Sequence, residues 1–520
     1  MSRTILKSTS VVGATTLVSR ITGLFRDVAL AQAFGASALQ DAFLVAYKIP
    51  NFLRRLFAEG SFSQAFVPVI SEYRLKRSQA EVKELVSGVT GTLGGVLLAV
   101  TAVGVVAAPL IILLYATGFT RDAGKFALTV QMLRWTFPYL LFISLTALFS
   151  GVLNSYRRFA LPAFTQVAMN LVMIFFAVGI AEHSRNPGIV LAVGVFVAGV
   201  LQLLMQLPSV ARLGLLSWPR WRPAHEGVRR IGRLMIPGIV GSSMAQVSLV
   251  LDTTIASWLV TGSVSWLYFA DRLMEFPLGV FSVALATVIL PGLSTHHTER
   301  SPEQFSLTLD WALRLTVMLV MPAAVGLLAF AGPITAAVFG YRNFNAHSVQ
   351  MASWALMAYS WGLVMFSLVK VLAPGFFARQ DTRTPVRASL VALAVNMAMN
   401  IGVALPASRL GFPAPHILLA TATCSGSAVN AYLLFRGLRR AGVYQPSKAW
   451  ATLWPRVLLA SALMGALLWW WSGSLEEWMA LRPVARLLRC AGGISAAGAL
   501  YFVVLYALGM RYRDLRTRPT

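Results

Sequence analysis

Apolar residues form long blocks along this chain, separated by short segments rich in charge and proline. A helix rises 1.5 Å per residue, so about 20 apolar residues cross the roughly 30 Å of hydrocarbon in a bilayer. The blocks reach that length again and again. They predict about fourteen transmembrane helices, over residues 10–34, 41–70, 86–116, 127–153, 160–181, 188–212, 231–260, 265–294, 307–332, 348–375, 386–406, 413–436, 451–471 and 487–509.

The composition supports the same fold class. Of 520 residues, 57% are hydrophobic and 12% are charged, whereas soluble domains carry about 25% charged residues. We therefore expect an all-α polytopic membrane protein. Cys424 and Cys490 lie far apart in apolar blocks, and the six histidines show no metal-ligand spacing. No disulfide framework, metal site or cofactor is expected.

The net charge of +25 reflects topology. About 26 basic residues fall in the termini and the loops on their side, against about seven in the other loops. An even number of spans places both termini on one side, and the excess of Lys and Arg marks that side as cytoplasmic. The sequence therefore predicts N-in and C-in, and it gives no reason to expect a nucleic-acid partner.

A basic stretch at residues 213–233, LGLLSWPRWRPAHEGVRRIGR, interrupts the series of spans. Its arginines and Trp218 and Trp221 are typical of a segment that rests on anionic lipid. It divides the chain into an N-lobe (1–212, six helices) and a C-lobe (234–440, six helices). Two further helices and a cytoplasmic tail follow in 441–520. A weak repeat links the lobes: VPVIS at 67–71 resembles ILPGLS at 289–294. In transporters, paired repeats place the substrate between them near the midplane.

Charged residues inside the predicted spans are the strongest functional signal. Inserting one charged side chain at mid-membrane costs about 2.5–3.5 kcal/mol of free energy, so inserting four arginines would cost roughly 10–14 kcal/mol. The arginine fork matches phosphate oxygens bidentately. We therefore predict a hydrated cationic cavity for a phosphate, pyrophosphate or carboxylate, lined by Arg20, Arg26, Arg54 and Arg272.

Other charges are spaced for pairing. Arg55 and Glu59 are i,i+4, and Arg272 and Glu275 are i,i+3 with Asp271 beside them. We expect these pairs to bias the gating of the cavity. The alternative is that such charges only pair with each other or reach the interface, which is our interpretation of Asp27, Arg314 and Lys370.

A cation site is a second possibility. Asp252 in the seventh span and Asn396 and Asn400 in the eleventh offer oxygen ligands for Na⁺ or a proton site. Ordinary hydrogen bonding between helices is the alternative. Transport coupled to Na⁺, to H⁺ or to the membrane potential remains open at this point.

Four motifs carry a resemblance to a known family: SRITGLFRD (19–27), DAFLVAYKIPNFLRRLFAEGSFSQAFVPV (41–69), GVLNSYRRFALPA (151–163) and YFADRLMEFPLGVF (268–281). They resemble the MurJ (MviN-type) lipid II flippases of bacterial peptidoglycan synthesis, within the multidrug/oligosaccharidyl-lipid/polysaccharide exporter superfamily. The resemblance implies that the four arginines contact the lipid II pyrophosphate and headgroup. It also implies that Asp41 is a functional acid of the cavity and that Glu59 shapes the portal. The last two helices would form a groove for the polyprenyl tail.

The expected function is therefore transport and not an enzymatic reaction. Lipid II would pass from the cytoplasmic to the periplasmic leaflet of the bacterial inner membrane by alternating access. The membrane potential favours outward movement of negative charge by about 2.3 kcal/mol per charge per 100 mV. The sequence has no GxxxxGK[ST] phosphate loop, so ATP hydrolysis by this chain is not expected. Expected partners are lipid II, membrane lipids and the cell-wall synthesis machinery.

The alternatives are exporters of another polyprenyl-pyrophosphate-linked saccharide or of a drug, within the same superfamily. An organic-cation antiporter would need an acidic cavity. A membrane enzyme acting on polyprenyl-phosphate sugars would need a carboxylate cluster such as DxD, which the 19 acidic residues do not form.

Overall fold

The computed structural model describes residues 3–55, 61–298 and 301–511. Every regular element in these ranges is helical. The chain separates into two compact units, Met1–Val264 and Ser265–Thr520. The predicted lobe boundaries around residues 213–233 stay a prediction.

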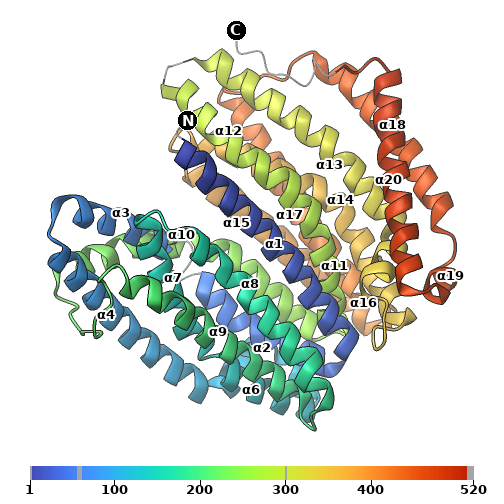
Figure 1. Cartoon of the computed structure of the whole chain (residues 1–520). Helices are drawn as coiled ribbons and strands as arrows, with labels where there is room; N and C mark the ends of the chain where they lie inside the picture. The colour runs from blue at the N-terminus through green and yellow to red at the C-terminus, as the bar shows by residue number, and fades with distance from the viewer. Residues whose placement is uncertain (1–2, 56–60, 299–300, 512–520) are drawn as a thin grey trace. The chain divides into compact units, whose positions relative to one another are not determined.

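The first unit contains the helices up to α10 (Figure 1). They are α1 (Arg3–Phe34), α2 (Ala38–Arg54), α3 (Ser61–Lys76), α4 (Gln79–Val106), α5 (Ala108–Tyr115), η2 (Thr117–Arg121), α6 (Ala123–Thr136), α7 (Tyr139–Ser155), α8 (Ala160–Ile174), η3 (Phe175–Ile180), η4 (Ala181–His183), α9 (Pro187–Ala211) and α10 (Glu226–Ser257).

The helices from α11 onward make up the second unit, apart from the first two residues of α11. They are α11 (Ser263–Pro277), η5 (Leu278–Val283), α12 (Ala284–Thr298), α13 (Pro302–Phe339), α14 (Ala346–Phe377), α15 (Arg383–Met399), η6 (Asn400–Ala404), α16 (Leu405–Arg409), α17 (His416–Arg440), α18 (Ala449–Ser472), α19 (Leu475–Ala480) and α20 (Pro483–Ala507).

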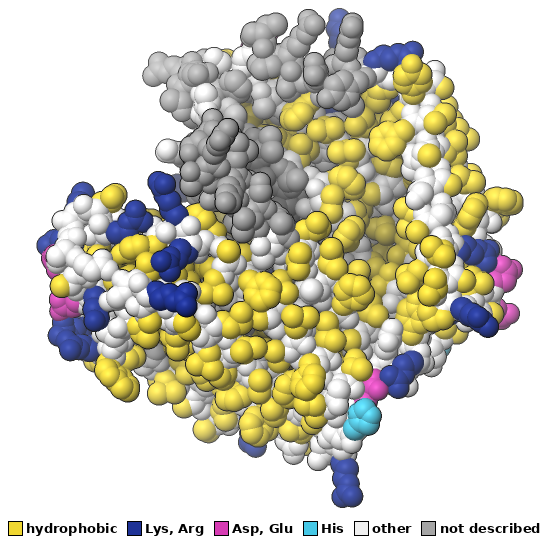
Figure 2. Space-filling model, in the orientation of Figure 1, with side chains coloured by type: hydrophobic (Ala, Val, Ile, Leu, Met, Phe, Trp, Pro, Cys, Tyr) yellow, Lys and Arg dark blue, Asp and Glu magenta, His cyan; other side chains and the backbone are white. Residues whose placement is uncertain are grey.

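The fold class predicted from hydropathy is confirmed. Ten helical segments among the described residues are long and apolar enough to cross a membrane; the number fourteen stays a prediction. Hydrophobic side chains are spread widely over the face in Figure 2, and the Lys and Arg side chains in view lie mainly near its margins. Such an apolar exterior suits a multi-pass membrane protein, because lipid and not water is its solvent.

Pro277 lies where the charged helix α11 changes its winding. Pro277 is the last residue of α11, and the next six residues form a π-helical segment. Proline lacks an N–H and clashes with the carbonyl four residues earlier. The regular ladder therefore ends immediately after Asp271, Arg272 and Glu275, and π segments of this kind are frequent at functional sites.

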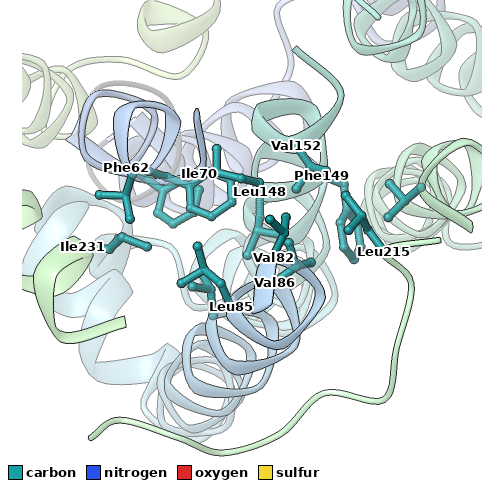
Figure 3. Close-up of a cluster of buried hydrophobic side chains, with 14 of the residues drawn as sticks. Phe62, Ile70, Val82, Leu85, Val86, Leu148, Phe149, Val152, Leu215 and Ile231 are labelled. Atoms are coloured by element: carbon teal, nitrogen blue, oxygen red, sulfur yellow. The ribbon is translucent and has the colours of Figure 1, made fainter. Parts of the chain in front are cut away.

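The core of the first unit includes residues of the linker and of α10, which follow helices α1–α9 in the chain (Figure 3). Phe62 and Ile70 of α3 pack with Leu85 of α4, and Leu215 of the linker and Ile231 of α10 belong to the same buried cluster. Burial of each such side chain contributes about 1.5–3 kcal/mol. This packing explains why α10 belongs to the first compact unit.

The basic linker is hydrogen-bonded to α4. Ser87 O accepts the Arg220 N–H at 3.1 Å, and Ser87 Oγ donates to Trp218 O at 2.6 Å. A Cβ on Gly91 would lie 2.3 Å from the Arg220 backbone, so only glycine admits this approach. Trp218 is 88% exposed. Contact of the linker with lipid stays a prediction.

Candidate functional site

Arg26 is buried at a junction of α1 and α8. Its Nη2 lies 2.8 Å from Asp27 Oδ1, and its Nη1 donates to Asn170 Oδ1 at 3.1 Å. The Asn170 amide donates in turn to Ser19 O and Thr22 Oγ1, both at 3.1 Å. The pairing that the sequence suggested for Asp27 is confirmed. Sequence reasoning missed Asn170, because an asparagine 144 residues away carries no pattern that points to Arg26.

Arg20, on the same helix, is exposed. The two arginines that were assigned together from the sequence therefore differ: one is held by a carboxylate and an amide, and the other lies at the surface of its unit. Their shared role in lining a cavity stays a prediction.

Asp41 forms the most completely buried charge pair described in the first unit. Its Oδ2 accepts a hydrogen bond from Lys125 Nζ at 2.9 Å and another from the Gly262 N–H at 2.8 Å. The side chains of Asp41 and Lys125 are 1% and 6% exposed. Lys125 Nζ also lies 4.1 Å from the centre of the Phe119 ring, a cation–π contact. One carboxylate thus ties α2, α6 and the α10–α11 connection together.

Sequence reasoning missed Lys125 as this partner. The topology held the signal: Asp41, Lys125 and Gly262 all lie at span ends on the side predicted to be periplasmic. A buried carboxylate requires a compensating charge or donors, and Lys125, two residues before the predicted span 127–153, was one of about seven basic residues on that side.

The inner half of the second predicted span is only partly described. Arg54 is half-buried, and its Nε donates to Asn51 Oδ1 at 2.8 Å. Arg55 is exposed. Glu59 lies outside the described residues, so the Arg55–Glu59 pair stays a prediction. Lys48 Nζ reaches Thr253 Oγ1 of α10 at 3.4 Å.

The second unit holds the predicted Arg272–Glu275 pair. Arg272 Nη1 lies 2.8 Å from Glu275 Oε2, which confirms the i,i+3 spacing as an ion pair. The guanidinium also lies 5.5 Å from the centre of the Tyr268 ring. Tyr268 and Glu275 thus hold Arg272 along one stripe of α11, and Asp271 beside it is half-buried.

The candidate cation ligands are divided between the two units. Asp252 Oδ2 lies 3.4 Å from Ser248 Oγ in the first unit. In the second unit, the buried Asn400 amide donates to Asn396 Oδ1 at 3.0 Å, where α15 passes into a π segment. A common site for the three stays a prediction. Among the described residues, no group of three His, Cys, Asp or Glu side chains could hold a metal ion.

Outside the spans, a charged network connects α3 with α10. Glu72 Oε2 lies 2.9 Å from Arg230 Nη1, and Glu72 Oε1 lies 3.4 Å from Lys76 Nζ. Hydrogen bonding and attraction from Arg230, and then from Lys76, hold the pKa of Glu72 below its ordinary value. The carboxylate therefore stays ionised and its basic partners stay attached at neutral pH.

Comparison with known proteins identifies the family. Residues 30–488 match the sequence model of the family described as "Lipid II flippase MurJ". The chain belongs to the MurJ family. A relative from Haemophilus influenzae, described as a probable lipid II flippase MurJ, is 42% identical over 97% of this chain and 100% of its own length. The lipid II flippase MurJ of Burkholderia cenocepacia is 42% identical over 97% of each chain.

Solved structures show the same fold. A lipid II flippase MurJ in an inward closed conformation aligns with a TM-score of 0.77 and 24% identity, over 97% of this chain and 99% of that one. A multidrug-resistance MATE transporter of the MOP superfamily, in an inward-facing conformation, aligns with a TM-score of 0.65 and 14% identity. That match covers 82% of this chain and 95% of the transporter. The MurJ fold predicted from the motifs is thus confirmed over nearly the whole chain.

Proposed function

We propose that this protein is a lipid II flippase that moves lipid II from the cytoplasmic to the periplasmic leaflet of the bacterial inner membrane. The observation that carries the proposal is the match to the MurJ family over residues 30–488, together with relatives 42% identical over nearly full length that bear this name. The proposed orientation is N-in and C-in, from the distribution of Lys and Arg between the loops. Lipid II is a peptidoglycan precursor, so the protein would serve cell-wall growth and cell shape.

The arginines supply the chemistry for a pyrophosphate. A guanidinium offers five N–H donors in a planar fork, and Arg26 and Arg272 each direct part of that fork to a carboxylate, Asp27 and Glu275. A pyrophosphate can exchange with these carboxylates, since both acceptors are anionic oxygens. Arg20 and Arg54 would complete the cationic cavity, and Asp271, Glu275 and the Arg55–Glu59 pair would bias its opening.

Asp41 takes a structural part in this proposal besides the one that the family resemblance implied. Its Oδ2 accepts hydrogen bonds from both Lys125 Nζ and the Gly262 N–H. It would therefore hold α2, α6 and the α10–α11 connection together at the outer end of the first unit during transport, and its role as a functional acid of the cavity stays a prediction.

Alternating access of the two lobes is the proposed mechanism. The membrane potential would drive outward movement of the anionic headgroup, and a cation at Asp252, Asn396 and Asn400 would couple to it if these oxygens converge in one state. The tail would stay in lipid against α18 and α20, which expose Trp469, Trp470 and Phe502. Lipid II delivered in this way is the substrate of the cell-wall synthesis machinery outside.

Depletion of the protein in cells without a second flippase tests the activity. We expect lipid II to become inaccessible to a probe added outside, because it accumulates in the inner leaflet. Unchanged access after depletion would refute the proposal. Arg26→Ala and Arg272→Ala should each abolish complementation while the protein still reaches the membrane. Arg409→Ala, an exposed arginine at the end of α16, is the matched control and should complement fully.

A further inference from the structure

A small pocket opens in the second unit where α13, α18 and α20 pack together. Its volume is about 200 Å³, and its walls include Trp311, Arg314, Thr452, Leu453 and Arg456. Pockets for whole drug-sized ligands measure about 300–1,000 Å³. This one therefore has room for a headgroup, while any chains attached to the headgroup would have to stay outside.

Two guanidinium groups give the pocket its charge. Arg314 Nε lies 2.9 Å from Asp310 Oδ2 in an ion pair, yet it is buried and makes no hydrogen bond with any described residue. The Arg314 side chain as a whole is 27% exposed. Arg456 has no ion-pair partner among the residues that the structure describes. Arg314 and Arg456 both line the cavity, and guanidinium groups at a cavity wall favour an anionic ligand with several oxygens.

Asp310 makes the pocket rigid and offsets the charge of Arg314, so Arg456 supplies the net positive charge of the pocket. The carboxylate, 1% exposed, accepts hydrogen bonds from Tyr444 Oη at 2.9 Å, Ser447 Oγ at 2.6 Å and Trp450 Nε1 at 2.7 Å. Three donors from the α17–α18 connection and the start of α18 thus share its negative charge with Arg314. The wall is fixed in advance, so a ligand would lose little free energy in ordering it.

The start of α18 adds to the attraction for an anion. This helix of 24 residues has no side-chain cap at its N-terminus. The Trp450 and Ala451 N–H groups donate to the Ser447 and Lys448 carbonyls at 3.3 and 3.2 Å, and the positive end of the helix dipole lies at this turn. Positions 449, 452, 453 and 456 share one face of α18, and all four line the pocket. The helix N-terminus and Arg456 therefore act on the same space.

We propose that this pocket binds the phosphate of an anionic phospholipid from the cytoplasmic leaflet, with the acyl chains lying in the bilayer beside α18. The guanidinium fork matches phosphate oxygens, and the cytoplasmic surface is rich in anionic lipid. Trp450 and Trp454, with ring centres 5.8 Å apart, are the residue type that settles at the membrane interface. The proposal relies on the N-in, C-in orientation and not on lipid II transport. The lipid would brace α18 and α20 against α13.

Lipid binding to the purified full-length protein tests this. Native mass spectrometry in detergent, with titrated phosphatidylglycerol or phosphatidylcholine, gives the affinity, and thermal unfolding gives the stabilisation. We expect phosphatidylglycerol to bind and to raise the unfolding temperature. Arg456→Gln and Arg314→Gln should each weaken phosphatidylglycerol binding about tenfold. Arg439→Gln, at the end of α17 outside the pocket, is the control and should bind normally. Arg456→Gln breaks no described ion pair, so the test stands even if Arg314→Gln fails to fold.

Three results would overturn the proposal. Equal binding of phosphatidylglycerol by the wild type and Arg456→Gln would mean that the lipid binds elsewhere. Equal stabilisation by inorganic phosphate would mean that the pocket takes a free anion. Equal binding of phosphatidylcholine and phosphatidylglycerol by the wild type would mean that the pocket does not recognise an anionic headgroup.

Discussion

Removal of Asp41 isolates the contribution of one buried ion pair to the first unit. In Asp41→Ala, the buried ammonium group of Lys125 would keep the Phe119 ring as its contact among the partners described above, and the Gly262 N–H would lose its acceptor. Lys125→Met creates the converse state, in which the Asp41 carboxylate keeps only the Gly262 N–H among the partners described above. The double variant removes both charges and leaves no isolated ion.

The magnitude follows from the burial of both groups. Removal of one partner from a buried pair costs about 3–5 kcal/mol, because the other charge stays desolvated and uncompensated. We expect each single variant to lose an unfolding free energy in that range. The double variant should lose less than the sum of the two, with a coupling of about 2–3 kcal/mol, since contacting charges are strongly non-additive.

The wild type, the two single variants and the double variant form a double-mutant cycle. Reversible unfolding in mixed micelles, monitored by tryptophan fluorescence, measures the unfolding free energy of each of the four proteins. Lys83→Met, at an exposed lysine on α4, is the control and should change stability by no more than about 0.5 kcal/mol. Simple additivity of the two single losses would refute the reasoning, because it would show that Asp41 and Lys125 do not stabilise each other.

Three further expectations concern other parts of the chain. Asp310→Ala leaves four donors without their acceptor and should lower the unfolding free energy by about 3–5 kcal/mol, whereas the exposed Glu303→Ala should be nearly neutral in the same assay. Gly91→Ala would drive a Cβ to 2.3 Å from the linker backbone and should speed trypsin cleavage of the linker; Gly94→Ala, whose Cβ meets only a side chain at 3.8 Å, should not. Asp381 accepts hydrogen bonds from the Thr384 hydroxyl and N–H, which lower its pKa. Its contribution of about 1 kcal/mol as a hydrogen-bond acceptor for the first N–H groups of α15 should be complete above roughly pH 4 and fade as pH falls through the lowered pKa, so the stability difference between the wild type and Asp381→Ala should shrink there.

The sequence by itself determined the fold class, because hydropathy over 20 residues depends only on composition within one block. It also determined the Arg272–Glu275 pair. An α-helix places residues three apart on neighbouring turns wherever the helix lies, and the structure has this pair at 2.8 Å. The family followed from motifs in the first, second and eighth spans and at the junction of the fourth and fifth, and the comparison over residues 30–488 confirms it.

Only the tertiary structure decided which distant groups meet. Lys125 lies 84 positions from Asp41 and Tyr444 lies 134 from Asp310, yet both pairs are in hydrogen-bond contact. No sequence pattern indicated a role for Asp310, although its carboxylate accepts hydrogen bonds from residues at the start of α18. The reason is physical: the rise and turn of one helix follow from local bonding, whereas the rotation and depth of two packed helices depend on every side chain between them. Hydropathy shows that a helix lies in the membrane, and packing alone shows which partner each buried charge receives.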